Sequence, residues 1–257
     1  MFRSILLLIL LLFLYGCSSP ELTDDVKPVE LTVSAATSMQ DVLKELKNIF
    51  EEEHPTIDIA FNFGATGTLS QQISQGAPVD IFLSASREKF DELMDKELIH
   101  DEFHHHLIGN EIVLIVPKEN EKNIVSVEDL TTKAKKISIG IPEVVPVGAY
   151  AKEALVTMGV WSTIENKVVP AKDVRQVLTY VETGNVDAGF VYKTDTEVSD
   201  QIQIIKSIEA TQHSPIIYPI GIINTTVHVE EAKLFYEFLT SERALTLFEE
   251  YGFSRLE

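Results

Sequence analysis

Cysteine and tryptophan are nearly absent from the 257-residue chain, which contains one of each. The single cysteine, Cys17, has no partner within the chain, so a fold held together by internal disulfides is excluded. Basic residues are also scarce, because 21 Lys and Arg stand against 40 Asp and Glu, a net charge of −19. A chain this acidic does not offer a basic surface to nucleic acid or to anionic lipid. We therefore expect no nucleic-acid partner.

Sequence patterns of common hydrolases and nucleotide-binding enzymes are missing as well. The chain contains no G-x-S-x-G, no H-E-x-x-H and no G-x-x-x-x-G-K-[ST]. Its clustered histidines, His104, His105 and His106, are adjacent, so their side chains point in different directions on any regular backbone. A solvated loop explains them more simply than a metal site does. We expect no catalytic residue, no cofactor and no bound metal cation, and we predict that the protein is not an enzyme.

The longest apolar run lies at the start of the chain, over Ile5–Tyr15. It is shorter than the ~20 residues of a membrane-spanning helix, and it has the charged start and small final residue of a secretory signal. The sequence Leu-Tyr-Gly before Cys17 resembles the lipobox of bacterial lipoproteins, which implies that Cys17 is lipidated. We expect residues 1–16 to be a signal peptide and 17–29 a lipidated tether. The mature protein would then be lipid-anchored to the extracytoplasmic face of the cell membrane.

After this segment, helical and strand-like spacing of apolar residues alternate. Val42, Leu46 and Phe50 recur at helical spacing and predict an amphipathic helix over 38–53. Strict alternation over 57–63 predicts a strand with one buried face. The same order repeats along the chain, with later helices expected to begin at Thr68 and Ala149, which predicts an α/β fold with mainly parallel sheets.

No linker rich in Pro, Gly or Ser divides the chain, so two lobes would have to be joined by ordered crossing strands. The best candidates are residues 108–114 and 213–220. Since the two helices that close the chain need a sheet to cover, we expect the chain to return to its first sheet. The expected division is lobe 1 over 30–108 plus 219–257, and lobe 2 over 109–218.

Small and hydroxyl-bearing residues follow strands and open helices at four places, beginning at Ala35, Gly64, Pro146 and Ala171. In open α/β sheets, ligands bind beyond the carboxyl ends of the strands. Helix N-termini offer free N–H groups and a partial positive charge, which suit an oxyanion. A Ser or Thr at such a place is more often a helix cap than a ligand contact. The pattern alone therefore indicates a small anion or another polar ligand.

Five segments, which follow one another over nearly all of the mature chain, resemble the molybdate-binding proteins of ABC importers. They are VSAATSMQDVLKELKNIFEEE (33–53), FNFGATGTLSQQISQGAPVDIFLSA (61–85), IGIPEVVPVGAYAKEAL (139–155), AKDVRQVLTYVETGNVDAGFVYKTD (171–195) and LFEEYGF (247–253). The resemblance implies the type II periplasmic-binding-protein fold, with two α/β lobes and a ligand cleft between them. It also implies a monomer that delivers molybdate to an ABC permease and its ATPase.

The same resemblance implies five ligand-binding residues. Ser38 matches a hydroxyl donor at the first strand–helix junction, and Thr66 matches a position that is usually serine in the family. Val147 and Val174 match positions that donate backbone N–H groups, and Tyr192 matches a tyrosine that donates its hydroxyl. The extra methyl group of Thr66 is a departure from the family that could alter the preference between anions.

Neutral donors suit molybdate, which carries no proton at neutral pH and can only accept hydrogen bonds. Hydrogen phosphate would bring a proton that lacks an acceptor. Tungstate has nearly the same size as molybdate and is expected to bind too, whereas sulfate would be excluded by its smaller size. Three alternatives stay open at this point: a carrier of another oxyanion such as sulfate, a sensor with the same binding features, and a secreted α/β enzyme using Asp or His.

Overall fold

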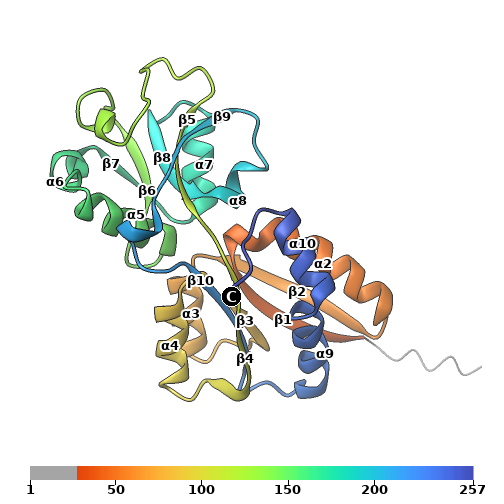
Figure 1. Ribbon diagram of the computed structural model, residues 1–257. Helices are drawn as coiled ribbons and strands as arrows, with labels where there is room; N and C mark the ends of the chain where they lie inside the picture. Colours follow the sequence, from red (N-terminus) through yellow and green to blue (C-terminus); the bar gives the residue numbers. More distant parts are fainter. Residues whose placement is uncertain (1–27, 257) are drawn as a thin grey trace, which may run out of the picture.

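The computed structural model describes residues 28–256 and places their strands in two five-stranded sheets. The first sheet has the order β2-β1-β3-β10-β4, from Ile57–Gly64, Val29–Ala36, Ile81–Leu83, Ile217–Ile223 and Ile99–Gly109. The second has the order β7-β6-β8-β5-β9, from Val168–Ala171, Ile137–Gly140, Ala188–Tyr192, Ile112–Pro117 and Ile202–Ser207. Each sheet forms the centre of its own lobe (Figure 1), which confirms the predicted two-lobed α/β fold of the type II periplasmic-binding-protein class.

Helices cover both faces of the first sheet. Those on one face are α2 (Gln40–Glu53), α9 (Val229–Leu239) and α10 (Glu242–Glu250), and those on the other are α3 (Thr66–Ser74) and α4 (Arg87–Met94). The apolar stripe of α2 is buried, as its spacing predicts, and includes Val42, Leu46 and Phe50. Phe82 and Phe90 belong to a separate apolar cluster beneath α3 and α4. Because the two closing helices pack on this sheet, the first lobe is discontinuous in sequence.

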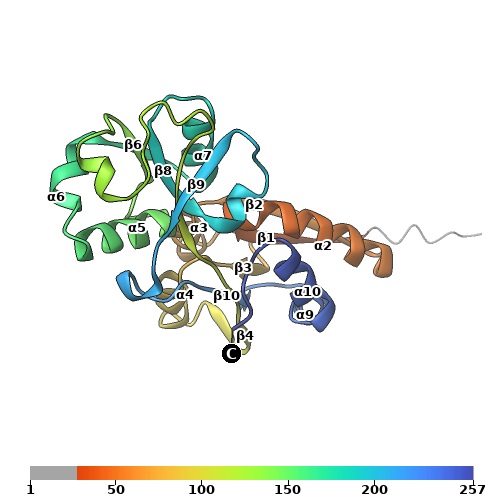
Figure 2. The same ribbon diagram turned by 45° about the horizontal axis from the view of Figure 1, so that its top comes forward.

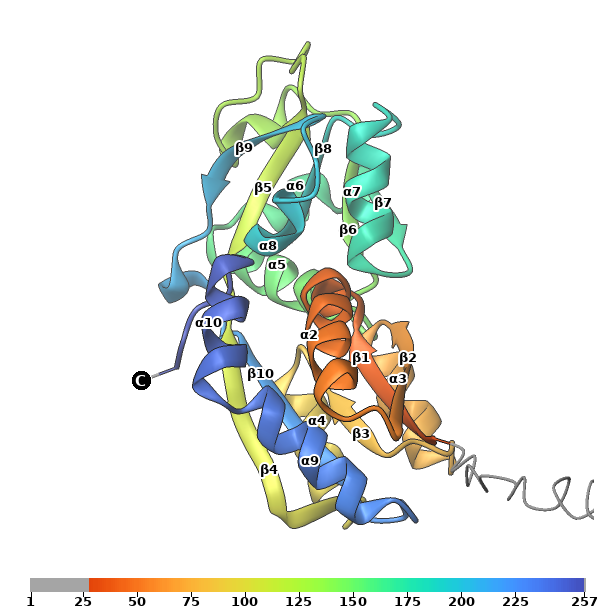
Figure 3. The same cartoon turned by 90° about the vertical axis from the view of Figure 1, so that its right-hand side faces the viewer.

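The second sheet is covered by α5 (Pro146–Thr157) and α7 (Val174–Glu182), both of which contact β6 and β8. Its fourth strand, β5, is buried along Ile112–Val116 and pairs with neighbours on both sides, which explains its unbroken apolar sequence. Two short helices, α6 (Trp161–Ile164) and α8 (Lys193–Thr196), follow α5 and β8. Figures 2 and 3 show this lobe beside the first, with the chain crossing from β4 to β5 and returning before β10.

Two predictions from the sequence are wrong in detail. Each sheet is mixed rather than mainly parallel, because β10 pairs antiparallel with β3 and β4, and β5 pairs antiparallel with β8 and β9. His104, His105 and His106 form no loop but lie in β4, opposite residues 219–221 of β10. Since β4 is an edge strand whose histidine side chains are exposed, it lacks the apolar alternation that marks a buried strand.

None of the helices in the described range has the length and apolarity needed to span a bilayer. The segments predicted as signal peptide (1–16) and lipidated tether (17–29) fall almost entirely outside the described residues, as does Cys17.

Candidate functional site

A small cavity lies where the two lobes meet, and all five residues predicted to bind a ligand line it. The space between the lining residues measures about 230 Å³, including the part that is open to solvent. Its lining consists of Ala36, Thr37, Ser38, Gly64, Ala65, Thr66, Ala85, Val145, Pro146, Val147, Asp173, Val174 and Tyr192. The first seven lie at or just beyond the ends of strands of the first sheet, and the last six belong to the second lobe. Ser38, Thr66, Val147, Val174 and Tyr192 are all buried, so the structure gathers the predicted residues instead of scattering them.

The first turns of α3, α5 and α7 line this cavity, and two of these helices have backbone N–H groups there without an acceptor among the described residues. Helix α5 begins at Pro146, earlier than expected, so Val147 lies in its first turn. Proline has no N–H, and the N–H of Gly148 donates to the carbonyl of Val145 at 2.9 Å. Within residues 28–256 the N–H of Val147 has no protein acceptor. Such a group at a helix N-terminus carries part of the positive end of the helix dipole.

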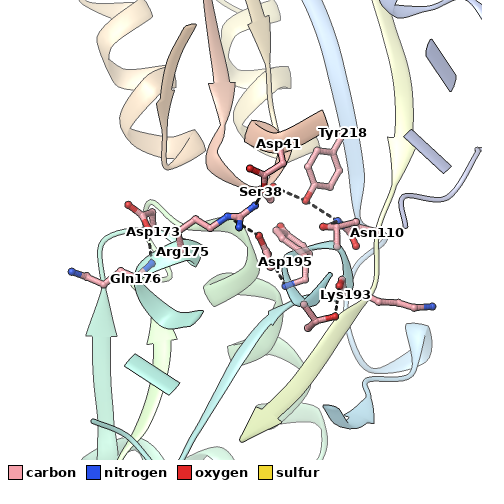
Figure 4. Close-up of polar contacts among 12 residues, drawn as sticks. Ser38, Asp41, Asn110, Asp173, Arg175, Gln176, Lys193, Asp195 and Tyr218 are labelled. Atoms are coloured by element: carbon pink, nitrogen blue, oxygen red, sulfur yellow. Dashed lines mark hydrogen bonds and ion pairs between the residues drawn. The ribbon is translucent and has the colours of Figure 1, made fainter. Parts of the chain in front are cut away.

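Helix α7 supplies the second backbone donor. The carboxylate of Asp173 caps the helix by accepting the N–H of Gln176 at 2.8 Å (Figure 4). It leaves the N–H of Val174, the first residue of the helix, without an acceptor in the described part of the chain. Asp173 is the only charged residue among the described residues of the cavity lining, and one of its two carboxylate oxygens is used in this capping bond.

Thr66 contributes a hydroxyl from the first turn of α3, which also begins two residues earlier than the sequence predicts. Its Oγ1 accepts the backbone N–H of Ala85 at 3.0 Å. Because the oxygen already accepts from the protein, its own proton is free to be donated into the cavity. The side chain is fully buried, so this orientation is not disturbed by bulk solvent.

Ser38 is connected to the crossing strands through two buried polar groups. Its Oγ lies 3.0 Å from the hydroxyl of Tyr218 in β10. Tyr218 in turn accepts a hydrogen bond from Nδ2 of Asn110, which stands between β4 and β5, at 3.2 Å (Figure 4). Burial raises the pKa of Tyr218 well above its ordinary value, which keeps this hydroxyl protonated.

Tyr192 ends β8 and opens α8. Its backbone N–H donates to Oδ2 of Asp195 at 3.1 Å, which fixes the start of the short helix. Its buried hydroxyl has no hydrogen-bond partner among residues 28–256, an uncommon state for a buried polar atom. Burial raises the pKa of this hydroxyl far above its ordinary value, so it stays a protonated donor that awaits an acceptor.

The two lobes touch beside the cavity. The backbone N–H of Gly67 in α3 donates to the carbonyl of Val144 in the second lobe at 2.9 Å. A Cβ on Gly67 would lie 2.7 Å from the Cα of Val144, so only glycine permits this approach. Because Gly67 and Val144 join the lobes and the five site residues are buried, the lobes are closed around the cavity in this structure.

An ion-pair cluster spans the same boundary (Figure 4). Arg175, the residue after Val174, pairs with Asp41 of α2, and its Nε lies 3.5 Å from Oδ1 of Asp195. Asp195 is fully buried, and this burial raises its pKa to about 7, although the neighbouring guanidinium acts in the opposite direction. Arg175 therefore joins both lobes without lining the cavity itself.

Sequence reasoning missed the residues behind the cavity, namely Asn110, Tyr218, Asp41, Arg175 and Asp195. Tyr218 has the sequence context of an ordinary apolar strand residue, and no pattern near Asn110 predicts that its side chain binds the Tyr218 hydroxyl. Arg175 and Asp195 do fall inside segments that carry the family resemblance, and a lone Arg directly after a site residue was a usable signal. The exposed histidines of β4 do not line the cavity, and within residues 28–256 no three His, Cys, Asp or Glu side chains are grouped closely enough to hold a metal ion.

Comparison with known proteins agrees with this arrangement. The family model of bacterial extracellular solute-binding proteins matches residues 31–254. A putative ABC transporter substrate-binding lipoprotein of Bacillus subtilis, YvgL, is 49% identical over 95% of this chain and 94% of its own length. The molybdate-binding protein ModA of Haemophilus influenzae is 34% identical over 88% of this chain and 90% of its own length.

A solved structure extends the comparison to three dimensions. The substrate-binding domain of a putative molybdenum ABC transporter from Clostridium difficile is 38% identical to this chain. It superimposes with a TM-score of 0.69 and covers 89% of this chain and 100% of its own. The chain therefore belongs to the family of bacterial extracellular solute-binding proteins that includes the ModA proteins.

Proposed function

We propose that this protein captures molybdate, and tungstate with it, and delivers the ion to an ABC permease driven by its ATPase. The observation that carries the proposal is the donor set of the cavity. Ser38, Thr66, Val147, Val174 and Tyr192 offer three hydroxyls and two backbone N–H groups within one buried space. The lining contains no Lys, Arg or His among the described residues, so neutral donors and helix dipoles would replace the water shell of the ion.

Capture would proceed by closure of the lobes. Ser38 and Thr66 lie on the first lobe and the other three residues on the second, so only the closed form presents all five donors to one ion. A ligand that binds one conformation better shifts the population toward it. The role requires no chemical step on the ligand, which fits a carrier rather than an enzyme.

Calorimetric titration of the chain from residue 18 onward with molybdate, tungstate and sulfate tests the proposal. We expect tight binding of the two larger ions and at least a hundredfold weaker binding of sulfate, whose smaller tetrahedron cannot reach all five donors. Tight sulfate binding without molybdate binding would show that this is the carrier of another oxyanion. Single substitutions Ser38→Ala and Tyr192→Phe should each weaken molybdate binding by about tenfold or more.

We also propose the predicted arrangement of the whole chain. Residues 30–108 with 219–257 would move as one lobe and 109–218 as the other, with both boundaries inside or beside the crossing strands β4 and β10. Cys17 would carry the lipid that holds a monomer at the membrane. The change Cys17→Ser should move the protein from the membrane fraction to the soluble fraction and abolish incorporation of labelled fatty acid. Retention of the label would contradict the assignment.

A further inference from the structure

A directed series of hydrogen bonds leads from the crossing strands to the cavity. It starts at the backbone N–H of Glu111, which donates to Oδ1 of Asn110 at 2.9 Å. This bond fixes the orientation of the Asn110 amide, because it requires the carbonyl oxygen on that side. The amide nitrogen, Nδ2, then faces the hydroxyl of Tyr218 at 3.2 Å and Oγ1 of Thr194 at 3.0 Å.

The direction of each later bond follows from the first. An amide NH₂ can only donate, so the Tyr218 oxygen accepts from Asn110. The Tyr218 proton must then be donated elsewhere, and Oγ of Ser38 at 3.0 Å is the one other group within 3.5 Å that forms a hydrogen bond with this hydroxyl among residues 28–256. Ser38 Oγ therefore accepts from Tyr218, and its own proton is left to be donated into the cavity.

Thr66 is set in the same way by a different group. Its Oγ1 accepts the N–H of Ala85 at 3.0 Å, so its proton also remains for the cavity. The cavity is thus lined by two hydroxyls that each already accept one hydrogen bond from the protein, together with the backbone N–H groups of Val147 and Val174. Ser38 differs from Thr66 in that its direction depends on side chains, Tyr218 and Asn110, which a substitution can change.

We infer that Tyr218 and Asn110 are specificity-determining residues, which fix Ser38 as a donor and so make the cavity reject oxyanions that carry a proton. The inference rests on the proposed binding site. An ion without protons accepts from every group in the cavity. An ion with one hydroxyl must point that proton at an acceptor. If Ser38 accepted it, the Ser38 proton would have to turn away from the ion, and one hydrogen bond of the site would be lost.

The substitution Asn110→Asp reverses the series with little change in shape. One carboxylate oxygen still accepts the N–H of Glu111, while the other replaces the donor that faced Tyr218. Tyr218 then donates to this carboxylate and accepts from Ser38, which leaves a Ser38 lone pair facing the cavity. Tyr218→Phe removes the connection altogether and lets Ser38 rotate to accept or donate.

Selenate and arsenate are the probes that separate protonation from size and charge. At mildly alkaline pH both are tetrahedral dianions of nearly equal size, but selenate has no proton and hydrogen arsenate has one. The ratio of their affinities is measured by displacement of bound molybdate at millimolar probe concentrations. Since both carry the same charge, the added negative charge of Asn110→Asp cancels in this ratio.

We expect the wild-type protein to favour selenate over arsenate, and both variants to reduce that preference about tenfold. Tyr236→Phe is the matched control. Tyr236 lies in helix α9, away from the cavity, and packs against Phe103 of β4, so its substitution should leave the ratio unchanged. Folding of each variant is checked by its thermal unfolding. A ratio that stays constant in folded Asn110→Asp and Tyr218→Phe, while wild type binds molybdate, overturns this inference alone. If the wild type binds none of these oxyanions, the proposed site is wrong and the inference fails with it.

Discussion

The guanidinium of Arg175 forms an ion pair with the carboxylate of Asp41 and thereby joins a helix of the second lobe to a helix of the first. Both side chains are partly buried, and Arg175 immediately follows the cavity residue Val174. The pair forms across the boundary that must open to admit a ligand. It therefore contributes to the closed state and not to the stability of either lobe alone.

A double-mutant cycle on this pair should reveal its role in retention of the ion. We expect Arg175→Gln and Asp41→Asn each to speed molybdate dissociation about tenfold, because a partly buried pair that closes the lobes is lost. The double variant should be no faster than Arg175→Gln alone, since Asp41→Asn removes only a contact that Arg175→Gln has already removed. The measurement is stopped-flow dissociation into excess tungstate.

The control for this cycle is the ion pair between Arg243 and Glu53, which connects α10 and α2 within the first lobe. Breaking it should leave the dissociation rate unchanged. Additive effects of Arg175→Gln and Asp41→Asn would show that the two residues act separately, and would contradict a shared role in closure.

Gly67→Ala should block full closure while leaving each lobe folded. The added methyl carbon would lie 2.7 Å from the Cα of Val144, a backbone atom that cannot rotate away. We expect a loss of molybdate affinity of tenfold or more and a larger radius of gyration at saturating ligand, measured by small-angle X-ray scattering. Thr68→Ala, an exposed position in the same helix, is the control. An unchanged ligand-bound radius would mean that the lobes close without this contact.

Substitutions at Thr66 separate its hydroxyl from its methyl group. Thr66→Ser keeps the donor and the bond from Ala85, so molybdate affinity should change by less than about threefold. Thr66→Val keeps the shape but removes the donor and leaves the buried N–H of Ala85 unpaired, so affinity should fall about tenfold or more. Calorimetry with molybdate and tungstate checks both. A loss in Thr66→Ser as large as that in Thr66→Val would show that the methyl group contributes as much as the hydroxyl and would contradict the expectation.

Asp195 should make the stability of the ligand-free protein depend on pH. Burial raises its pKa from 3.8 to about 7, so the folded protein holds a proton that the unfolded chain releases between these values. The stabilising contribution of the protonated carboxyl is complete below 3.8 and is lost as pH rises to about 7. The slope is at most about 1.4 kcal/mol per pH unit.

The neutral variant Asp195→Asn should lack this dependence and become more stable relative to wild type as pH rises through that range. Urea unfolding at several pH values gives the comparison, and Asp58→Asn, at an exposed position in β2, corrects for the loss of a charge in general. If the variant is less stable than wild type by a constant amount throughout, the ion pair with Arg175 outweighs the burial of Asp195 and the expectation is wrong.

Periodicity in the sequence predicted the elements whose buried faces are regular. Helix α2 follows from the spacing of Val42, Leu46 and Phe50, and strand β2 follows from the alternation over 57–63, because each buries one apolar face. The edge strand β4 was not predicted, because its histidine side chains face solvent and the strand lacks alternating apolar residues. The predicted starts of α3 and α5 are too late, because Gly67 and Pro146 resemble residues that interrupt helices. In the structure Gly67 permits a close contact with Val144, and Pro146 suits the first turn of a helix.

The cavity was predictable to a different degree. Its five proposed ligand residues follow from family resemblance and lie together. The residues that contact them from behind, such as Tyr218 and Arg175, have no recognisable pattern in the sequence. Tyr218 stands 180 positions from Ser38, and Arg175 stands 134 positions from Asp41. No local pattern encodes a contact over such a separation. The chain must cross to the second lobe before Arg175 can reach Asp41, and it must also return before Tyr218 can reach Ser38.

The placement of the five proposed ligand residues on two lobes has a further consequence for transport. An ion bound to Ser38 and Thr66 on one lobe and to Tyr192 on the other keeps all of its hydrogen bonds only while the lobes are closed, so its release is coupled to the parting of the lobes. Residence time and handover are then governed by the same opening motion. Contacts between the lobes that raise the affinity for the ion also slow its release. The membrane complex must therefore supply the free energy that opens the lobes.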